Sequence, residues 1–268
     1  MSMDCKAESE QRLDGYALWV QNGSNQEQLL DYKGTSSISV IIPARNEAAT
    51  IGAIIGSIRS ECMLKTNLVD ELIVINDVSS DNTSGIAKES GADVIDMSKN
   101  QGVPFGKGAA LREGIRASSG DILLFLDADV TNFSSHFVTE MLAPLLIDKK
   151  LMLCKPKYQR FDGGTSFGGG RVTELVAKPV LEILLPQLAC IDQPLAGETS
   201  IRRELLEKIC VADNYQVEIA ILIDTYRLYG EDVIAQVDLG QRYHKSRTLT
   251  DLVPTAKDVL QAMLERLM

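Results

Sequence analysis

The chain has 268 residues, 45% hydrophobic and 24% charged, a balance typical of an ordinary soluble globular protein. Its 27 basic and 37 acidic residues give a net charge of −10, which argues against a general nucleic-acid surface. The N-terminus is polar and no apolar run reaches membrane-spanning length, so we expect no leader and no membrane partner. The five cysteines are scattered without a C-x-x-C pair, which favours a reducing compartment, and we expect a cytoplasmic protein.

Alternating strands and helices are predicted for the first half of the chain. Residues 1–36 are polar and weakly periodic, and we expect a partly ordered lead-in with a short helix near 17–20. Hydrophobic periodicity predicts strands over 39–43, 71–75, 92–96 and 122–126, and helices over 48–59, 82–90 and 109–118. This order predicts an α/β fold, a mainly parallel sheet with helices on both faces.

The second half is less regular, and we take its elements from shorter apolar patterns. Strands are expected over 151–160 and 233–237, followed by a polar segment over 238–247. Helices are expected over 172–185, interrupted by Pro179, and over 203–209, 215–228 and 256–268. The last of these is amphipathic, and its apolar face suggests a homodimer contact, although it could equally pack on its own domain.

Asp127 and Asp129 follow the apolar run 122–126, which is typical of a strand buried on both faces. Ligands of parallel sheets bind outside the carboxyl ends of the strands, and the polar loops 44–47 and 76–81 lie at such ends too. Two crowded carboxylates repel each other, and Mg²⁺ or Mn²⁺ would offset that repulsion. The alternative is a pair of solvated turn residues, but the convergence of three loops favours a metal and phosphate site.

Two glycine-rich loops are candidates for anion binding. The loop 102–108 is no P-loop, because Gly108 follows Lys107 where Ser or Thr is needed, yet Lys107 can still reach a phosphate. Three glycines at 168–170 precede Arg171 and Thr173 at a helix start, an arrangement that can hold an anion. A plain flexible loop and a capping loop with a surface arginine are the respective alternatives.

His244 and Glu218 each have two interpretations. His244 lies in a basic polar segment after a strand, where it is either a structural residue or a third metal ligand beside the two aspartates. Glu218 lies in an otherwise apolar helical stretch, as a solvated position or as a functional residue facing the crevice. Periodicity does not distinguish these interpretations.

Taken in order, these motifs resemble a known family. P-A-R-N-E at 43–47, the loop 76–81 and D-A-D at a strand end are similar to nucleotide-sugar glycosyltransferases of the GT-A fold. The chain is then similar to the glucosyl-3-phosphoglycerate synthase family over about residues 38–250. The matching motifs are P-F-G-K-G at 104–108, G-G-G-R-V-T-E-L-V at 168–176, Q-P-L-A-G-E at 193–198, Y-Q-V-E-I-A-I-L-I-D at 215–224 and Q-V-D-L-G-x-R-x-H at 236–244.

The resemblance implies a GT-A type, Rossmann-like fold with a smaller acceptor-binding C-terminal part. It implies transfer of glucose from UDP-glucose to 3-phosphoglycerate with retention, using Mg²⁺ or Mn²⁺. Residues 37–150 would bind the nucleotide sugar, residues 151–250 would form the acceptor-binding half of the same domain, and 251–268 would be the amphipathic helix of a homodimer.

The resemblance also implies roles for single residues. Pro43, Ala44, Glu47, Ser79, Lys107, Asp127 and Ala128 would bind the nucleotide sugar, and Asp129 and His244 would bind the metal. Gly170, Arg171, Thr173 and Ser246 would bind the acceptor, and Glu218, Asp129 and Arg171 would be catalytic.

Four positions depart from the family pattern. Asn76 stands where the family often has aspartate, Val78 and Ala196 where it has glycine, and Ser246 where it has asparagine. GDP-glucose or GDP-mannose as donor and glycerate as acceptor therefore stay open. So do two other classes, a sugar nucleotidyltransferase, which would release pyrophosphate, and a non-catalytic nucleotide-sugar binder.

Overall fold

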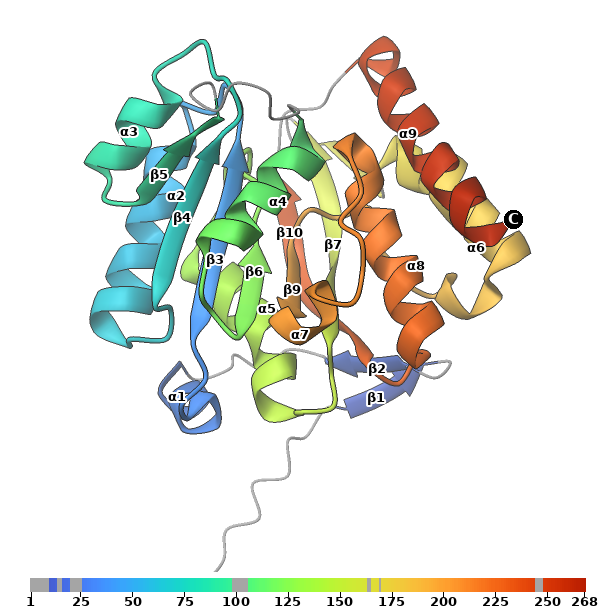
Figure 1. Ribbon diagram of the computed structural model, residues 1–268, viewed down its shortest axis with the longest axis horizontal. Helices are drawn as coiled ribbons and strands as arrows, with labels where there is room; N and C mark the ends of the chain where they lie inside the picture. The colour runs from blue at the N-terminus through green and yellow to red at the C-terminus, as the bar shows by residue number, and fades with distance from the viewer. Residues whose placement is uncertain are drawn as a thin grey trace, which may run out of the picture.

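A mixed β-sheet runs through the centre of the molecule, and helices cover both of its faces (Figure 1). The computed structural model describes residues 10–13, 16–19, 26–97, 106–162, 165–168, 170–243 and 248–268. The strand order is β1-β2-β10-β7-β9-β6-β3-β4-β5, and β8 pairs with β7. The strands are β1 Glu10–Leu13, β2 Tyr16–Trp19, β3 Ile38–Ala44, β4 Glu71–Asn76, β5 Asp93–Asp96, β6 Ile122–Phe125, β7 Leu153–Asp162, β8 Thr165–Gly168, β9 Thr199–Arg202 and β10 Ile234–Tyr243.

The helices of the first half alternate with the parallel strands, and those of the second half follow in groups. They are α1 Gln26–Lys33, α2 Ile51–Ser57, α3 Thr83–Glu89, α4 Lys107–Ala117, α5 Ser135–Ile147, α6 Lys178–Leu184, α7 Arg203–Leu206, α8 Val217–Tyr229 and α9 Leu249–Leu267. Two segments, η1 Ile58–Lys65 and η3 Thr173–Ala177, are π-helical. Within the described ranges, no helix combines the length and the apolar character needed to cross a membrane.

Strands β6, β3, β4 and β5 pair in parallel, as do β10 with β7 and with β2. The predicted α/β class with a mainly parallel sheet is therefore confirmed. Strand β9, which the sequence did not indicate, runs antiparallel between β6 and β7 and joins the two halves into one sheet. The assignment of donor binding to 37–150 and acceptor binding to 151–250 stays a prediction.

Consecutive residues of β3 face opposite cores. Val40 and Ile42 pack in a cluster with residues of α2 and α5, whereas Ile41 packs with residues of α4 and α8 (Figure 1). Because both faces are covered, the parallel strands read as continuous apolar runs. The carboxyl ends of β3, β4 and β6 meet at one edge, which is where the predicted polar loops lie.

Three local predictions are wrong. The short helix expected near 17–20 is instead β2, whose backbone pairs with β10. The strand expected to stop before Asp238 continues to Tyr243, because β10 keeps its pairing with β7 past a bulge. Pro179 does not interrupt its helix, which runs on from the π-helical segment η3 into α6 and changes from π to α form one residue before the proline.

Candidate active site

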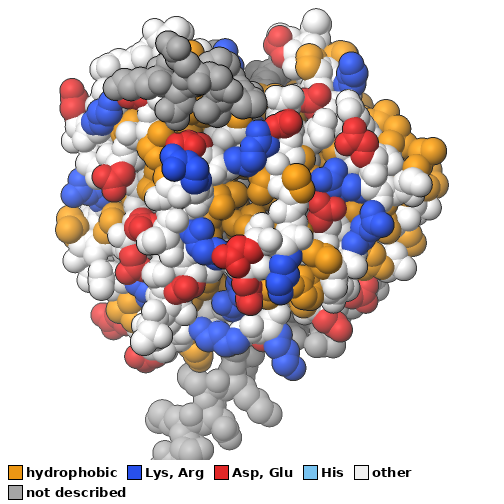
Figure 2. Space-filling view, in the orientation of Figure 1, with side chains coloured by type: hydrophobic (Ala, Val, Ile, Leu, Met, Phe, Trp, Pro, Cys, Tyr) orange, Lys and Arg blue, Asp and Glu red, His pale blue; other side chains and the backbone are white. Residues whose placement is uncertain are grey.

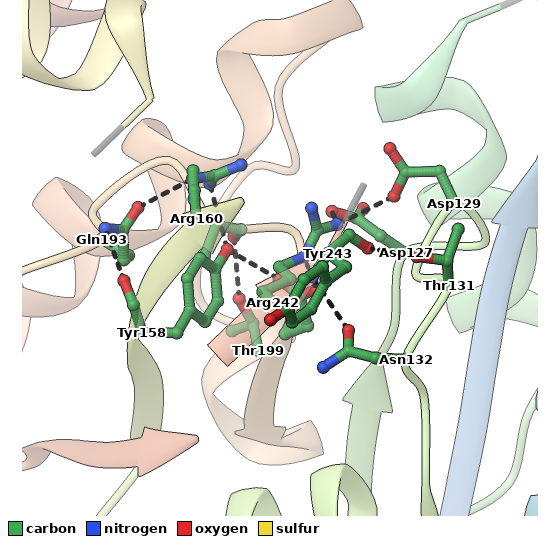
Figure 3. Close-up of polar contacts among 12 residues, drawn as sticks. Asp127, Asp129, Thr131, Asn132, Tyr158, Arg160, Gln193, Thr199, Arg242 and Tyr243 are labelled. Carbon is green, nitrogen blue, oxygen red and sulfur yellow. Dashed lines mark hydrogen bonds and ion pairs between the residues drawn. The ribbon is translucent and has the colours of Figure 1, made fainter. Parts of the chain in front are cut away.

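Asp127 and Asp129 lie in the loop after β6, at the carboxyl edge of the parallel strands (Figure 3). The hydroxyl of Thr50 donates to the carbonyl oxygen of Ala128 at 2.6 Å and fixes the backbone between the two aspartates. Both carboxylates accept from Arg242, whose Nη2 lies 2.9 Å from Oδ2 of Asp127 and 2.8 Å from Oδ1 of Asp129. The repulsion between the two aspartates is thus offset within the protein by an arginine.

A bulge in β10 directs Arg242 into the protein. The register with β7 shifts between Asp238 and Gln241, and Gly240 inside the bulge has a φ of +73°, which favours glycine. Nε of Arg242 donates to Oε1 of Glu198 at 2.7 Å, and both side chains are 1% exposed. Burial alone would favour the neutral form, but Glu198 and the neighbouring carboxylates raise the pKa of Arg242 well above its ordinary value.

Lys107, the first residue of α4, lies between two carboxylates. Its Nζ is 2.9 Å from Oδ1 of Asp127 and 2.6 Å from Oε1 of Glu218, which is buried. Burial opposes the charged amine, yet these carboxylates raise the pKa of Lys107 above its usual range. Burial likewise opposes ionisation of Asp127, but Lys107 and Arg242 lower its pKa below the usual range. Lys107 and Asp127 are therefore both charged at neutral pH.

The backbone of Gly197 passes directly behind the Lys107–Asp127 ion pair. A Cβ atom on this glycine would lie 2.0 Å from Oδ1 of Asp127 and 2.6 Å from Nζ of Lys107, so any side chain there would displace the ion pair. Lys155, fully buried on β7, donates to the carbonyl oxygen of Ala196 at 2.6 Å and to the hydroxyl of Thr199 at 2.9 Å. Burial lowers the pKa of Lys155 to about 8. The loop before β9 is thus held against the site from β7.

A cavity of about 440 Å³ opens beside these charged groups. This volume lies in the range of pockets that hold small molecules and cofactors. Seven of the predicted site residues line it: Pro43, Ala44, Glu47, Lys107, Asp127, Ala128 and Asp129. Six others line it as well: Arg45, Asp77, Gly106, Ala110, Asn214 and Tyr215.

Ser79 lies outside this lining and supports the loop that forms it. Its hydroxyl accepts from the backbone N–H of Asn46 at 3.0 Å, and Oδ1 of Asn46 accepts from the N–H of Ser80 at 2.8 Å. The N–H of Glu47 donates to the hydroxyl of Thr83 at 2.8 Å. The loops after β3 and β4 are therefore joined to each other.

The predicted acceptor residues stand at the start of η3 and do not line that cavity. Arg171 is exposed, Thr173 is buried, and the carbonyl of Gly170 accepts from the backbone of the next helical turn. A Cβ atom on Gly170 would lie 3.6 Å from Nε of Arg160, so a second guanidinium lies beside the glycine. Ser246, like the predicted metal ligand His244, lies outside the described residues.

The donor set at the aspartates fits a divalent ion held together with a diphosphate. Oδ2 of Asp129 has no hydrogen-bond partner within the described residues, and the side chain is 36% exposed. Nowhere in the described ranges do three or more His, Cys, Asp or Glu side chains form a complete metal site. Mg²⁺ is usually bound by one or two carboxylates plus substrate phosphates, which is the arrangement Asp129 permits.

The sequence assigned no role to four charged residues that build this site. Arg242 lies in the basic segment before His244, Lys155 in the predicted strand 151–160, Glu198 at the end of the motif 193–198 and Asp77 in the loop 76–81. A signal was present for Lys155, because a charged residue inside an apolar strand must find a buried partner. Arg242 carried no such signal, because its burial depends on the bulge.

Comparison with known proteins places the chain in a family. The model of glycosyl transferase family 2 matches residues 39–210. The chain is 42% identical over 260 residues to glucosyl-3-phosphoglycerate synthase of Mycobacterium tuberculosis, covering 92% of this chain and 79% of that protein. It is 41% identical over 245 residues to the synthase of Petrotoga mobilis, covering 89% and 75%.

Solved structures agree with the sequence comparison. The M. tuberculosis enzyme in complex with Mn²⁺, UDP-glucose and phosphoglyceric acid matches with a TM-score of 0.85 and 42% identity, covering 93% of this chain and 86% of that one. Its complex with phosphoglyceric acid gives a TM-score of 0.87 at 41% identity, covering 95% and 88%. The chain therefore belongs to glycosyl transferase family 2 and to the glucosyl-3-phosphoglycerate synthase family.

Proposed function

We propose that the protein transfers glucose from UDP-glucose to the hydroxyl of 3-phosphoglycerate with retention, releasing UDP and glucosyl-3-phosphoglycerate. The observation that carries this proposal is the cluster in which Lys107 and Arg242 hold Asp127 and Asp129 beside the 440 Å³ cavity. Structures of the M. tuberculosis relative support it, since they contain Mn²⁺ or Mg²⁺ with UDP, and Mn²⁺ with UDP and glucosyl-3-phosphoglycerate.

The nucleotide would occupy the cavity between the ends of β3, β4 and β6. Pro43, Ala44 and Glu47 would hold the uracil and ribose, and Asp127 would contact the ribose. The ammonium group of Lys107 lies on the same wall and supplies positive charge for the diphosphate.

Mg²⁺ or Mn²⁺ would be held by Asp129 and, as a proposal, by His244. When bound, it would supply electrostatic stabilisation of the negative charge that develops on the departing UDP. Arg242 keeps Asp129 in place, because its guanidinium contacts one carboxylate oxygen at 2.8 Å and leaves the other for coordination. Asp127, with both oxygens engaged by Lys107 and Arg242, would contact the ribose without binding the metal.

The acceptor would bind at the start of η3. The phosphate and carboxylate of 3-phosphoglycerate require two sets of donors, and the guanidinium of Arg171 with the hydroxyl of Thr173 provides one. Arg160, beside Gly170, provides further positive charge within the same region. Arginine suits this task because its planar fork binds phosphate and carboxylate oxygens in pairs. The acceptor hydroxyl would then be positioned against the anomeric carbon.

Glu218 is proposed as a positioning group for the sugar or the acceptor hydroxyl. Its carboxylate is buried and bonded to Lys107 at 2.6 Å. Because Oε1 of Glu218 is paired with Lys107, a front-face attack fits retention. In this step the acceptor oxygen bonds to the anomeric carbon on the side from which the phosphate oxygen of UDP leaves, and the leaving phosphate oxygen takes the proton of the acceptor hydroxyl.

Two of the departures from the family pattern, Asn76 and Val78, flank Asp77, which lines the cavity. The side-chain amide of Asn76 donates to Oδ1 of Asp96 at 2.8 Å, and Ser84 and Lys88 bond the same carboxylate. Burial opposes this ionisation, but these donors lower the pKa of Asp96 to about 2. Val78 has a φ of +54°, a strained conformation for a β-branched residue where the family has glycine.

The experiment is a product assay with UDP-glucose, GDP-glucose and GDP-mannose against 3-phosphoglycerate and glycerate, with and without Mg²⁺. We expect UDP release with UDP-glucose and 3-phosphoglycerate, dependent on the metal, and a product whose anomeric proton shows the configuration of the donor by NMR. Asp129→Asn should abolish this turnover, whereas Asp31→Asn on the exposed face of α1 should not change it. Pyrophosphate release would indicate a nucleotidyltransferase, and binding without turnover would indicate a non-catalytic binder.

A homodimer through the C-terminal region is a further part of this proposal. Exposed apolar side chains gather at one edge, over α6 and α9 (Figure 2). The exposed apolar side chains of α6 and of the C-terminal half of α9 are Ile183, Leu184, Leu260 and Leu264. Light scattering after size-exclusion chromatography should give a dimer that Ile183→Glu dissociates, whereas Leu64→Glu, equally exposed on η1, should leave it intact.

We also propose a cytoplasmic site of action. Among the described residues, Cys62, Cys154 and Cys210 are free thiols, which agrees with a reducing compartment. Secretion of the native protein into the culture medium would contradict this placement.

A further inference from the structure

The loop after β6 is bonded to the end of β10 by hydrogen bonds to its backbone (Figure 3). Nδ2 of Asn132 donates to the carbonyl oxygen of Gln241 at 2.8 Å, and its Oδ1 accepts from the N–H of Tyr243 at 2.8 Å. The N–H and the hydroxyl of Thr131 both donate to the carbonyl oxygen of Tyr243, at 3.0 and 3.2 Å. One amide side chain thus pairs with the strand end as a neighbouring strand would.

Arg242 lies between the two residues that are held in this way. Its guanidinium bonds the aspartates of the same loop, so the loop and the strand end are connected both by backbone and by charge. On the other side, the ring of Tyr243 stacks on Phe161 with centroids 5.1 Å apart and 16° between planes. The position of Arg242 relative to Asp129 therefore depends on contacts made by Asn132.

We infer that Asn132 is a positioning residue that sets Asp129 for divalent-metal binding, acting through the end of β10 and Arg242. Arg242 takes one oxygen of Asp129, and its placement decides where the other oxygen points. Groups that orient a ligand without touching the metal commonly change metal affinity by 10- to 100-fold. This inference rests on the proposed function, in which Asp129 holds the metal of the UDP complex.

Asn132 is suited to a clean test because its side chain is exposed, so truncation leaves no buried hole. Asn132→Ala removes two of the four hydrogen bonds between loop and strand end, and Thr131→Val removes one while keeping the backbone donor. A matched control is Gln261→Ala, which removes a surface amide bonded at 2.8 Å to a side chain of α9.

The experiment measures Mn²⁺ binding to the full chain in the presence of UDP, by electron paramagnetic resonance of free Mn²⁺, together with melting temperature and turnover against Mn²⁺ concentration. For Asn132→Ala we expect about 10- to 100-fold weaker Mn²⁺ binding, a kcat that recovers at saturating Mn²⁺, and a melting temperature within a few degrees of wild type. Thr131→Val should show a smaller loss in the same direction, and Gln261→Ala none.

Unchanged Mn²⁺ binding by Asn132→Ala would overturn the inference. So would a loss of kcat that saturating Mn²⁺ does not restore and that accompanies a large fall in melting temperature, because that pattern describes a purely structural residue. The proposed function is judged separately, by turnover of the wild-type protein with UDP-glucose and 3-phosphoglycerate.

Discussion

Arg242 should be among the most sensitive positions of the protein to truncation. Arg242→Met keeps much of the side-chain volume but removes the cation shared by three carboxylates. Within the described part of the chain, Glu198, 1% exposed, would keep one hydrogen bond, from the hydroxyl of Tyr158 at 3.1 Å, whereas Asp127 would keep Lys107. Removing one partner of a buried ion pair typically costs about 3–5 kcal/mol, because an uncompensated charge stays buried.

The contribution of the third carboxylate is small by comparison. The Arg242–Asp129 pair includes a carboxylate that is 36% exposed, and pairs open to solvent contribute roughly 0–1 kcal/mol. We therefore expect Arg242→Met to lower the free energy of unfolding by about 3–5 kcal/mol, with most of the loss arising at Glu198. In a chain of this size, that loss corresponds to a fall in melting temperature of roughly 10 °C.

Urea unfolding followed by far-UV circular dichroism measures this loss. Glu198→Gln and the double variant complete a cycle, and the double variant should lose less than the two single variants together, because no charge is then left alone. Arg116→Met is the matched control, since it breaks an ion pair with Glu113 in which the arginine is 72% exposed. A loss for Arg242→Met under about 1 kcal/mol, as expected for such an exposed pair, would refute the reasoning.

Three further predictions concern other parts of the site. The pKa of Lys155 is about 8 in the folded protein, against 10.5 for an ordinary lysine in the unfolded chain. Between these pH values the unfolded chain binds more protons than the folded protein, so the free energy of unfolding rises with pH. Relative to Lys155→Met, wild type should gain on the order of 3 kcal/mol of unfolding free energy from pH 8 to 10.5 in urea, and parallel pH profiles of the two proteins would contradict this. Gly197→Ala should lower kcat/KM for UDP-glucose about tenfold or more, because its Cβ would meet the Asp127–Lys107 ion pair, whereas Gly56→Ala, with open space around it, should leave kcat/KM unchanged. Arg171→Ala should chiefly raise the KM for 3-phosphoglycerate, and unchanged acceptor kinetics would remove Arg171 from the acceptor site.

The sequence predicted well those features that depend on local periodicity. Continuous apolar runs such as Ile122–Phe125 identified the parallel strands, and the polar residues after them lie where a parallel sheet places its ligands. Pro43, Glu47, Lys107 and Asp127 accordingly come together around one cavity. The side chain of Ser79 supports that cavity from the next loop, a distinction that spacing along the chain cannot express.

The acceptor residues show where spacing alone stops being informative. Gly170, Arg171 and Thr173 are adjacent in sequence and stay adjacent at the start of η3, but their neighbour Arg160 comes from β7 and depends on the packing of the sheet. Strand β9 was missed for a similar reason. Three of its four residues are buried because β6 and β7 flank them, and a run that short has no periodicity of its own.

The sequence by itself determined the α/β class, the edge of the sheet where the site lies, and the presence of two aspartates there, because strand periodicity and strand ends are local properties. Tertiary structure alone decided how those aspartates are held. Arg242 lies 113 residues from Asp129, and it reaches the carboxylates because a bulge at Gly240 turns its side chain inward. Electrostatic interaction acts through space and not along the chain, so the partner of a buried charge is known only once the strands have been brought together.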